Sequence, residues 1–458
     1  MKTFKNIFLV VAGLAVFSSC EKILTFEPEG EGIILEEQAL QTKEDLQKLL
    51  NSVYDVEANF LGGQNQNFSE LLADNVSLPN NNDDYQQIWR HGSNFFNGTV
   101  SNVFADAYRA IYRSNVVLKD MGRIEMSAEE MQRFEGEALF IRALNHFVIV
   151  RQFAQPYGFN TNNTQLGIGV KTEPTFDPVY RESVNDVYEQ IVADLKNAEA
   201  KLPENNGIYA DQFAAKALLA KVYLDMSDWQ NAYDYANEVI SSNRYTLEDS
   251  LDRFSPGTST EAIFEVVSTN SVDERGLGFK NNYRSDGANA SPTLRASKEL
   301  YNAATADTND LRGQKWYRLI GADTPDEFVG VAKFDFSYIN VPVLHLTEMK
   351  LIRAETLGEL NTNLSQGESD INDIRARAGL NALSIISGTQ LKDAAHLERR
   401  LEMVFEGDRV HQLKRQAVNG DVTEIRDSPW DCAGMVIQFP NSEGTVQGFI
   451  FNPEGGCN

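Results

Sequence analysis

The sequence predicts an all-α protein, an α-α superhelix of antiparallel helix pairs with a long irregular insertion and minor β content. Three segments support this prediction. Residues 138–150 contain only three polar side chains, so a helix here is apolar on nearly every face and lies inside a helical bundle. This segment of thirteen residues is too short to span a bilayer, so its surroundings are protein. Residues 211–242 and 341–377 each contain two helical stretches joined by a short polar turn.

The segment 211–242 has the more specific pattern of the two helix pairs. On both sides of a turn at Ser227–Asp228, small residues alternate with bulky ones. The small residues are Ala214, Ala217, Ala220, Ala232 and Ala236, and the bulky ones are Leu218, Tyr223, Trp229 and Tyr233. Small side chains against large ones allow two helices to pack closely, which is typical of a tetratricopeptide unit. The second pair begins at Val341 and turns at Asn361–Asn363.

Apolar residues at helical spacing predict further helices over residues 42–56, 68–74, 100–121, 183–202 and 391–415. Thr42 and Ser183 are the expected N-caps of the first and fourth of these helices. Irregular structure is expected over residues 62–67, 75–98 and 243–340. Inside the last of these regions, residues 261–267 alternate like a strand. After residue 428, two short apolar runs at 435–439 and 449–451 suggest a small hairpin.

Charged residues in the predicted helices need partners if they are buried. We expect Glu137 and Arg142 of the central helix to form framework ion pairs. Glu406 and Arg409 are spaced to pair with each other at i,i+3.

The N-terminus has the features of a secretory signal. Lys2 and Lys5 precede an apolar run of eleven residues, followed by Ser18, Ser19 and Cys20. Small residues directly before a cysteine resemble a bacterial lipobox, which predicts a signal peptide at 1–19, a lipid on Cys20 and a tether over 20–32. The alternative is an ordinary signal with an incidental cysteine.

Composition limits the kinds of ligand. The 458 residues have a formal net charge of −25, which opposes binding to phosphate backbones and favours a neutral or cationic ligand. The five histidines are scattered without metal-ligand spacing, and there is no glycine-rich phosphate loop, so we expect no metal and no cofactor. Carboxylates are plentiful, but nothing fixes two of them at the separation that glycoside hydrolysis needs.

Cysteine spacing leaves two alternatives open in the tail. If Cys20 carries a lipid, Cys432 and Cys457 remain as an even pair in an exported chain. They either form a disulfide across the tail or stay as two free thiols.

Four segments, in order, resemble the SusD/RagB family of outer-membrane nutrient-binding lipoproteins. The first is RAIYRSNVVL with FEGEALFIRALNHFVIVRQFAQPYG, and the second is AAKALLAKVYLDMSDWQNAYDYANEVI. The third is PVLHLTEMKLIRAE with INDIRARAGL, and the fourth is LERRLEMVFEGDRVHQLKR. The chain departs from the family pattern at Phe17, at the residues GESD before Ile371, and in an acidic export signal reduced to Glu21.

The resemblance implies one SusD-like domain over 33–458, with a helical framework in 33–242 and 341–427, an insertion at 243–340 and a tail at 428–458. It also implies an outer-membrane lipoprotein facing the cell exterior. Such a protein is not an enzyme; it captures oligosaccharides and delivers them to a TonB-dependent transporter of the SusC type. The alternatives are a peptide-capturing member of the family and a tetratricopeptide-type interaction protein.

The candidate ligand residues come from the two long irregular regions. Sugar rings stack on aromatic faces, and charged or amide side chains bind their hydroxyl groups. The candidates are Asp74, Trp89, Arg90, Phe96, Tyr283 and Trp316. The alternative is that each aromatic belongs to a small core beneath its loop.

Overall fold

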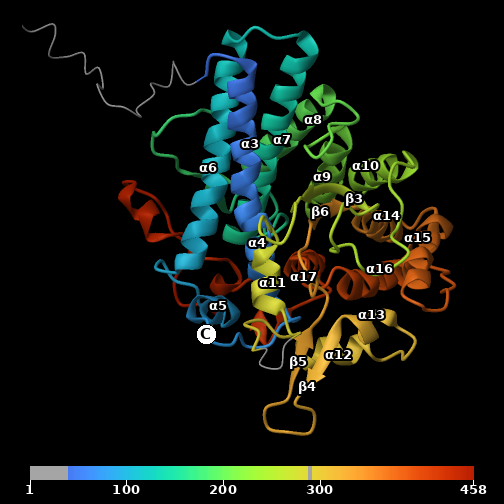
Figure 1. Ribbon diagram of the computed structural model, residues 1–458. Coiled ribbons are helices and arrows are strands. Elements are labelled where there is room, and N and C mark those ends of the chain that lie inside the picture. Colours follow the sequence, from blue (N-terminus) through green and yellow to red (C-terminus); the bar gives the residue numbers. More distant parts are fainter. Residues whose placement is uncertain (1–39, 287–290, 458) are drawn as a thin grey trace, which may run out of the picture.

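The computed structural model describes residues 40–286 and 291–457 (Figure 1). The predicted signal peptide, Cys20 and the tether lie outside these residues. Helices dominate the described part, which also contains four two-stranded antiparallel sheets, so the all-α prediction is confirmed. Within the described residues, no helix combines the length and the apolar character needed to cross a membrane.

Four long helices form an N-terminal bundle, with α7 in contact with both α6 and α8 (Figure 1). They are α3 (Lys43–Leu61), α6 (Gly98–Asp120), α7 (Ala128–Phe153) and α8 (Val184–Lys201). All residues of α7 from Gly136 to Val150 are buried, as predicted for the central helix. Thr42 and Ser183 accept the N-cap hydrogen bonds of α3 and α8. The strands β1 (Leu166–Gly169) and β2 (Arg181–Ser183) pair in the connection between α7 and α8.

The tetratricopeptide-like pairs continue the helical framework (Figure 1). Their helices are α9 (Gln212–Asp225), α10 (Trp229–Ser241), α14 (Leu346–Leu360), α15 (Leu364–Arg377) and α16 (Gly388–Glu402). The predicted turn between α9 and α10 is present, with Ser227 in the left-handed region at φ 57°. The small side chains are buried between helices, and Tyr223 stacks on Tyr235. α10 and α16 both pack on α14, which joins the pairs into one superhelix.

The insertion is built from short elements that pack on the framework. They are β3 (Ala262–Val266), α11 (Leu277–Tyr283), α12 (Lys298–Ala304), α13 (Leu311–Lys315), β4 (Tyr317–Ile320) and β5 (Phe328–Val331). The predicted strand is therefore confirmed, and it pairs with β6 (Val341–His345), which leads directly into α14. Aromatic contacts among Phe254, Phe279 and Phe334 form the centre of the insertion.

Three local predictions were wrong. The polar residues of 62–67 are not all loop, because α4 (Gln64–Leu72) starts at Gln64 and buries its amides in hydrogen bonds. The segment 75–98 contains a short helix, α5 (Asp83–Trp89), capped by Asn82. The stretch 391–415 is two helices, since α16 ends before a turn that leads to α17 (Arg409–Val418).

The tail also differs from its prediction. The described residues of 435–451 form no strands; a hairpin instead precedes them, formed by β7 (Glu424–Ile425) and β8 (Ser428–Pro429). Short 3₁₀ helices lie at Met121–Arg123, Ala433–Met435 and Asn441–Thr445. Cys432 and Cys457 are joined in a disulfide that closes the tail.

The expected ion pairs exist with other partners. Glu137 accepts from Arg133 at 2.6 Å rather than from Arg142, because residues five apart point to different sides of a helix. Arg142 pairs with Asp194 of α8. Glu406 lies in the turn after α16, so it does not share a helical face with Arg409.

Buried arginines connect the insertion to α16. Arg253 and Arg312 are almost completely buried and both pair with Glu402. Arg312 also pairs with Asp310 and Glu398. Because unpaired buried charges are very costly, these contacts hold the insertion in a defined position on the framework.

Candidate functional site

A large groove opens beside the C-terminal end of α5. Its volume is about 1000 Å³, and we call it the α5 groove. Five segments distant in sequence form its wall: the residues after α4, the end of α5, the start of α12, one residue of α16 and the β7–β8 turn. The side chains are Asp74, Val76, Ser77, Leu78, Trp89, Arg90, His91, Ser297, Lys298, Glu299, Arg400, Arg426, Asp427 and Ser428.

Trp89 is the only aromatic ring other than the imidazole of His91 in the described wall of this groove. The indole Nε1 donates to the carbonyl of Val76 at 3.0 Å, which fixes the ring while part of it stays exposed. The guanidinium carbon of Arg426 lies 4.3 Å from the ring centroid. This cation–π contact orients the two side chains together in the wall.

Arg426 is held over Trp89 by an unusual turn. Arg426 and Asp427 connect β7 to β8 with φ angles of 48° and 60°. Two-residue hairpin turns with both φ angles positive usually contain asparagine, aspartate or glycine, so Asp427 fits this turn whereas Arg426 is strained in it. Arg426 Nη2 donates to the carbonyls of Leu71 and Trp89, and these bonds help to keep the strained turn in place.

Asp74 lines the groove and forms ion pairs with two arginines. Arg409 donates to both of its carboxylate oxygens at 2.8 and 2.9 Å, and Arg400 Nη2 lies 3.1 Å from Oδ2. Burial raises the pKa of Asp74, but the hydrogen bonds and charge of Arg409 outweigh it and hold that pKa below its ordinary value. Asp74 is therefore ionised and already paired at neutral pH.

His91 contributes no charge to the groove at neutral pH. Burial and the nearby charge of Arg426 lower the pKa of His91 to about 4. Arg426 Nη2 donates to Nε2 of the neutral ring at 2.6 Å, Ser428 Oγ lies 3.0 Å from Nδ1, and the carbonyl of Leu72 lies 3.2 Å from Nε2.

Comparison with known proteins gives the family. The profile "Starch-binding associating with outer membrane" matches residues 29–224, and the profile "SusD family" matches residues 220–429. The chain belongs to the SusD/RagB family. SusD-like protein P2 of Formosa agariphila is 25% identical to it over 92% of each chain. SusD-like protein P38 of the same organism is 24% identical over 91% of this chain and 92% of its own length.

Solved structures of this family share the fold. A SusD superfamily protein from Bacteroides vulgatus superposes with a TM-score of 0.79 at 21% identity, covering 90% of this chain and 99% of that one. A SusD superfamily protein from Bacteroides thetaiotaomicron superposes with a TM-score of 0.78 at 24% identity, covering 90% of this chain and 100% of that one. A structure described as a laminarin-binding SusD-like protein superposes with a TM-score of 0.72 at 23% identity, covering 90% of this chain and 100% of that one.

The structure of this SusD-family chain brings three of the six candidate residues together. Asp74, Trp89 and Arg90 line the α5 groove. Phe96 is 78% exposed and lines a separate cavity of about 270 Å³ against the tail, which also includes Arg90.

Tyr283 and Trp316 are not available to a ligand in this structure. Tyr283 is 0% exposed and packs on Phe334, and Trp316 is 2% exposed beneath the ammonium of Lys333, 4.3 Å from its ring. Both rings belong to the core of the insertion, which is the alternative that the sequence left open. We therefore remove them from the candidate site.

Sequence reasoning missed the residues that the other segments contribute. Arg400 lies on a helix assigned to the framework, and Arg426 lies in a turn with no asparagine or glycine signal. Ser297 is the N-cap of a helix that is too short for a clear period. Only the packing of distant segments places these side chains around Trp89.

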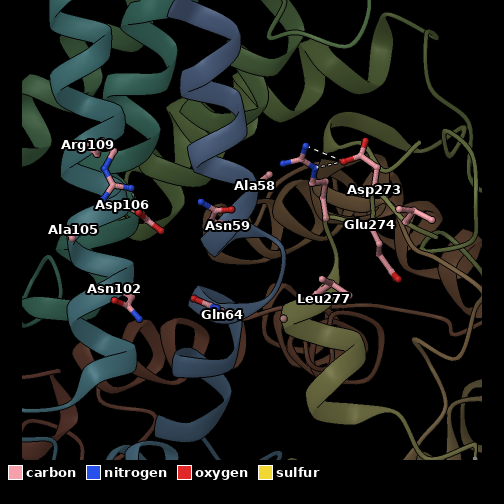
Figure 2. A pocket seen from close by; sticks show the side chains of 13 residues that line it. Ala58, Asn59, Gln64, Asn102, Ala105, Asp106, Arg109, Asp273, Glu274 and Leu277 are labelled. Carbon is pink, nitrogen blue, oxygen red and sulfur yellow. Dashed lines mark hydrogen bonds and ion pairs between the residues drawn. The ribbon is translucent and has the colours of Figure 1, made fainter. Parts of the chain in front are cut away.

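A second cavity, of about 460 Å³, lies between α6, the α3–α4 corner and residues 272–278 (Figure 2). Its wall contains amides and the ion pairs Asp106–Arg109 and Asp273–Arg275, but no aromatic ring. None of the six candidate residues lines it. Without a ring for stacking, it is a weaker candidate for sugar binding than the α5 groove.

The described residues also contain no group of three or more His, Cys, Asp or Glu side chains that could hold a metal ion.

Proposed function

We propose that this chain is a lipid-anchored protein of the outer cell surface that binds oligosaccharides in the α5 groove and passes them to a TonB-dependent transporter. It acts by binding and not by catalysis. The observation that carries the proposal is Trp89, which is fixed by its hydrogen bond and partly exposed in a groove of about 1000 Å³. Family membership and the laminarin-binding neighbour support it.

The groove has the chemistry that sugar binding needs. A pyranose ring has apolar C–H faces that can stack on the indole of Trp89, while guanidinium and hydroxyl groups nearby bind its hydroxyls. The groove is open and large enough for more than one sugar unit, so it suits a chain better than a monosaccharide. A shallow open site also fits a protein that must release its ligand to a transporter.

Trp89→Ala should weaken binding of the glycan ligand by about tenfold or more, since about 1.4 kcal/mol of lost stacking corresponds to one decade in Kd. The measurement is calorimetric titration, with laminari-oligosaccharides as the first probe and a panel of other polysaccharides and peptides beside it.

Trp316→Ala is the matched control, because the same ring is deleted from a buried place. It should lower the free energy of unfolding by about 3–5 kcal/mol and leave affinity unchanged. Wild-type affinity in the Trp89 variant would remove this groove from the proposal. A peptide as the only ligand in the panel would favour the peptide-capturing alternative.

Cys20→Ala should release the mature protein from the membrane fraction, because one lipid-carrying cysteine is the proposed anchor. Cell fractionation followed by immunoblotting measures the distribution. Retention of the variant in the outer membrane at the wild-type level would show that something other than the lipid holds it there.

A further inference from the structure

Two arginines in the α5 groove have no acidic partner. Among residues 40–286 and 291–457, no carboxylate lies within ion-pairing distance of Arg90 or Arg426. The other two cations of the wall are paired, Lys298 with Glu327 and Arg400 with Asp74. The chain has a net charge of −25, so it requires an explanation that two arginines without an acidic partner line the same groove as the partly exposed indole of Trp89.

Arg426 keeps free hydrogen-bonding capacity. Its Nη2 is occupied by the backbone carbonyls of Leu71 and Trp89 and by Nε2 of His91, which lies 2.6 Å away. Its Nε is buried without any acceptor among the described residues. Burial lowers the pKa of Arg426 to about 10, yet the side chain remains protonated at neutral pH. The Nε atom is closed off from the groove, but Nη1 makes no hydrogen bond among the described residues, so the half-buried guanidinium holds a positive charge that an incoming anion would compensate.

Arg90 is the second arginine of the groove without an acidic partner among the described residues. It directly follows Trp89, and its side chain is exposed and makes no hydrogen bond within the described part of the chain. Arg426 covers one face of the Trp89 ring, and Arg90 lines the same groove.

The acidic residues of the wall do not cancel this charge. Asp74 is shared between Arg400 and Arg409 and is neutralised by them. Glu299 and Asp427 are exposed to solvent. The wall thus carries four cationic side chains against three carboxylates, which makes it slightly positive on a strongly acidic protein.

We propose that the oligosaccharide bound in the α5 groove is acidic, with a carboxylate or sulfate group held by Arg90 and Arg426 beside a sugar ring stacked on Trp89. This inference rests on the proposed function and specifies its ligand. Guanidinium groups suit both anions because their planar N–H donors match paired oxygen atoms.

The overall charge of the chain does not prevent such binding. At physiological salt, charges more than about 8 Å away are largely screened, so an anion in the groove responds mainly to the nearest side chains. The sequence-based expectation of a neutral or cationic ligand follows from net charge alone, and the local arrangement of arginines reverses it at this site.

Paired oligosaccharides test the inference directly. Oligogalacturonate is compared with its methyl ester, and a sulfated galactan oligosaccharide with its desulfated form, by calorimetric titration on the full mature chain. We expect at least one charged member to bind about tenfold more tightly than its neutral counterpart, and this preference to shrink at high salt. The pair that shows the preference identifies the anion as carboxylate or sulfate.

Arg90→Gln tests the arginine itself, because its side chain supports no other described contact and the variant should fold normally. It should reduce the preference for the charged member about tenfold. Lys315→Gln removes the same charge from an exposed position on α13 outside the groove and controls for net charge. Equal effects of the two variants would overturn the role of Arg90.

The outcomes separate the two proposals. Neutral members that bind as tightly as their charged counterparts would overturn the acidic-ligand inference and leave oligosaccharide capture intact. Failure of every oligosaccharide, charged or neutral, including laminari-oligosaccharides, would overturn the proposed function itself.

Discussion

Replacing Glu402 by glutamine is expected to lower the free energy of unfolding by about 3–5 kcal/mol, because it removes one buried carboxylate that three buried arginines share. Glu402 is fully buried, and its Oε1 accepts from Arg253 and Arg377 at 2.8 Å. Its Oε2 lies 3.4 Å from Arg312 Nη1. Glutamine keeps the size of the side chain but presents a neutral amide to three guanidinium groups. Urea denaturation at pH 7 measures the loss.

The pH dependence of this loss has a definite sign. Burial raises the pKa of Glu402, but the charges of Arg377, Arg253 and Arg312 outweigh burial and hold it well below the ordinary value of 4.5. A carboxyl whose pKa is lower in the folded state stabilises the protein above its unfolded pKa. This contribution disappears as the pH falls through the folded value. The difference in free energy of unfolding between wild type and variant should therefore be constant near neutral pH and become smaller only at acidic pH.

Glu57→Gln is the matched control, because it makes the same change at another buried glutamate with the opposite expected result. Burial raises the pKa of Glu57 to about 8, and the hydrogen bond from Asn145 only partly opposes it. The folded state therefore holds Glu57 protonated at pH 7, which lowers stability because the unfolded chain prefers the ionised form. The variant should be as stable as wild type or more so. Equal losses at Glu57 and Glu402 would mean that charge is not the cause.

The sequence predicted the long helices better than the partners of buried polar and charged side chains. The sequence correctly predicted α7 from its apolar residues on nearly every face, and the α9–α10 pair from small residues alternating with bulky ones. The first turn of α4 was missed because Gln66 and Asn67 look exposed in sequence yet are buried through hydrogen bonds. The ionic partners of Glu137 and Glu406 were also missed. Glu137 pairs with Arg133, one turn earlier on the same helix face, and Glu406 pairs with Arg253 of a distant segment.

The candidate site shows the same limit. Trp89 and Trp316 both lie in polar regions without helical periodicity, so the sequence does not distinguish them as candidate ligand-binding residues. Packing separates them, because Lys333 and the insertion core cover Trp316 whereas Trp89 keeps an exposed part beside Arg426. The turn that positions Arg426 lacks the Asn-Gly or Asp-Gly pair typical of two-residue hairpins, so the sequence did not indicate that Arg426 covers Trp89.

Leu144→Ala is expected to lower the free energy of unfolding by about 2–5 kcal/mol, through lost contacts and the cavity left behind. Leu144 is 2% exposed near the middle of α7, the helix that packs on both α6 and α8. Leu397→Ala is the control, because Leu397 is 50% exposed on α16 and the same truncation there should cost well under about 1 kcal/mol. Chemical denaturation of both variants measures the difference. Similar small losses would show that α7 tolerates a cavity, contrary to its place between α6 and α8; a large loss at Leu144 alone would support α7 as the helix that holds the N-terminal bundle together.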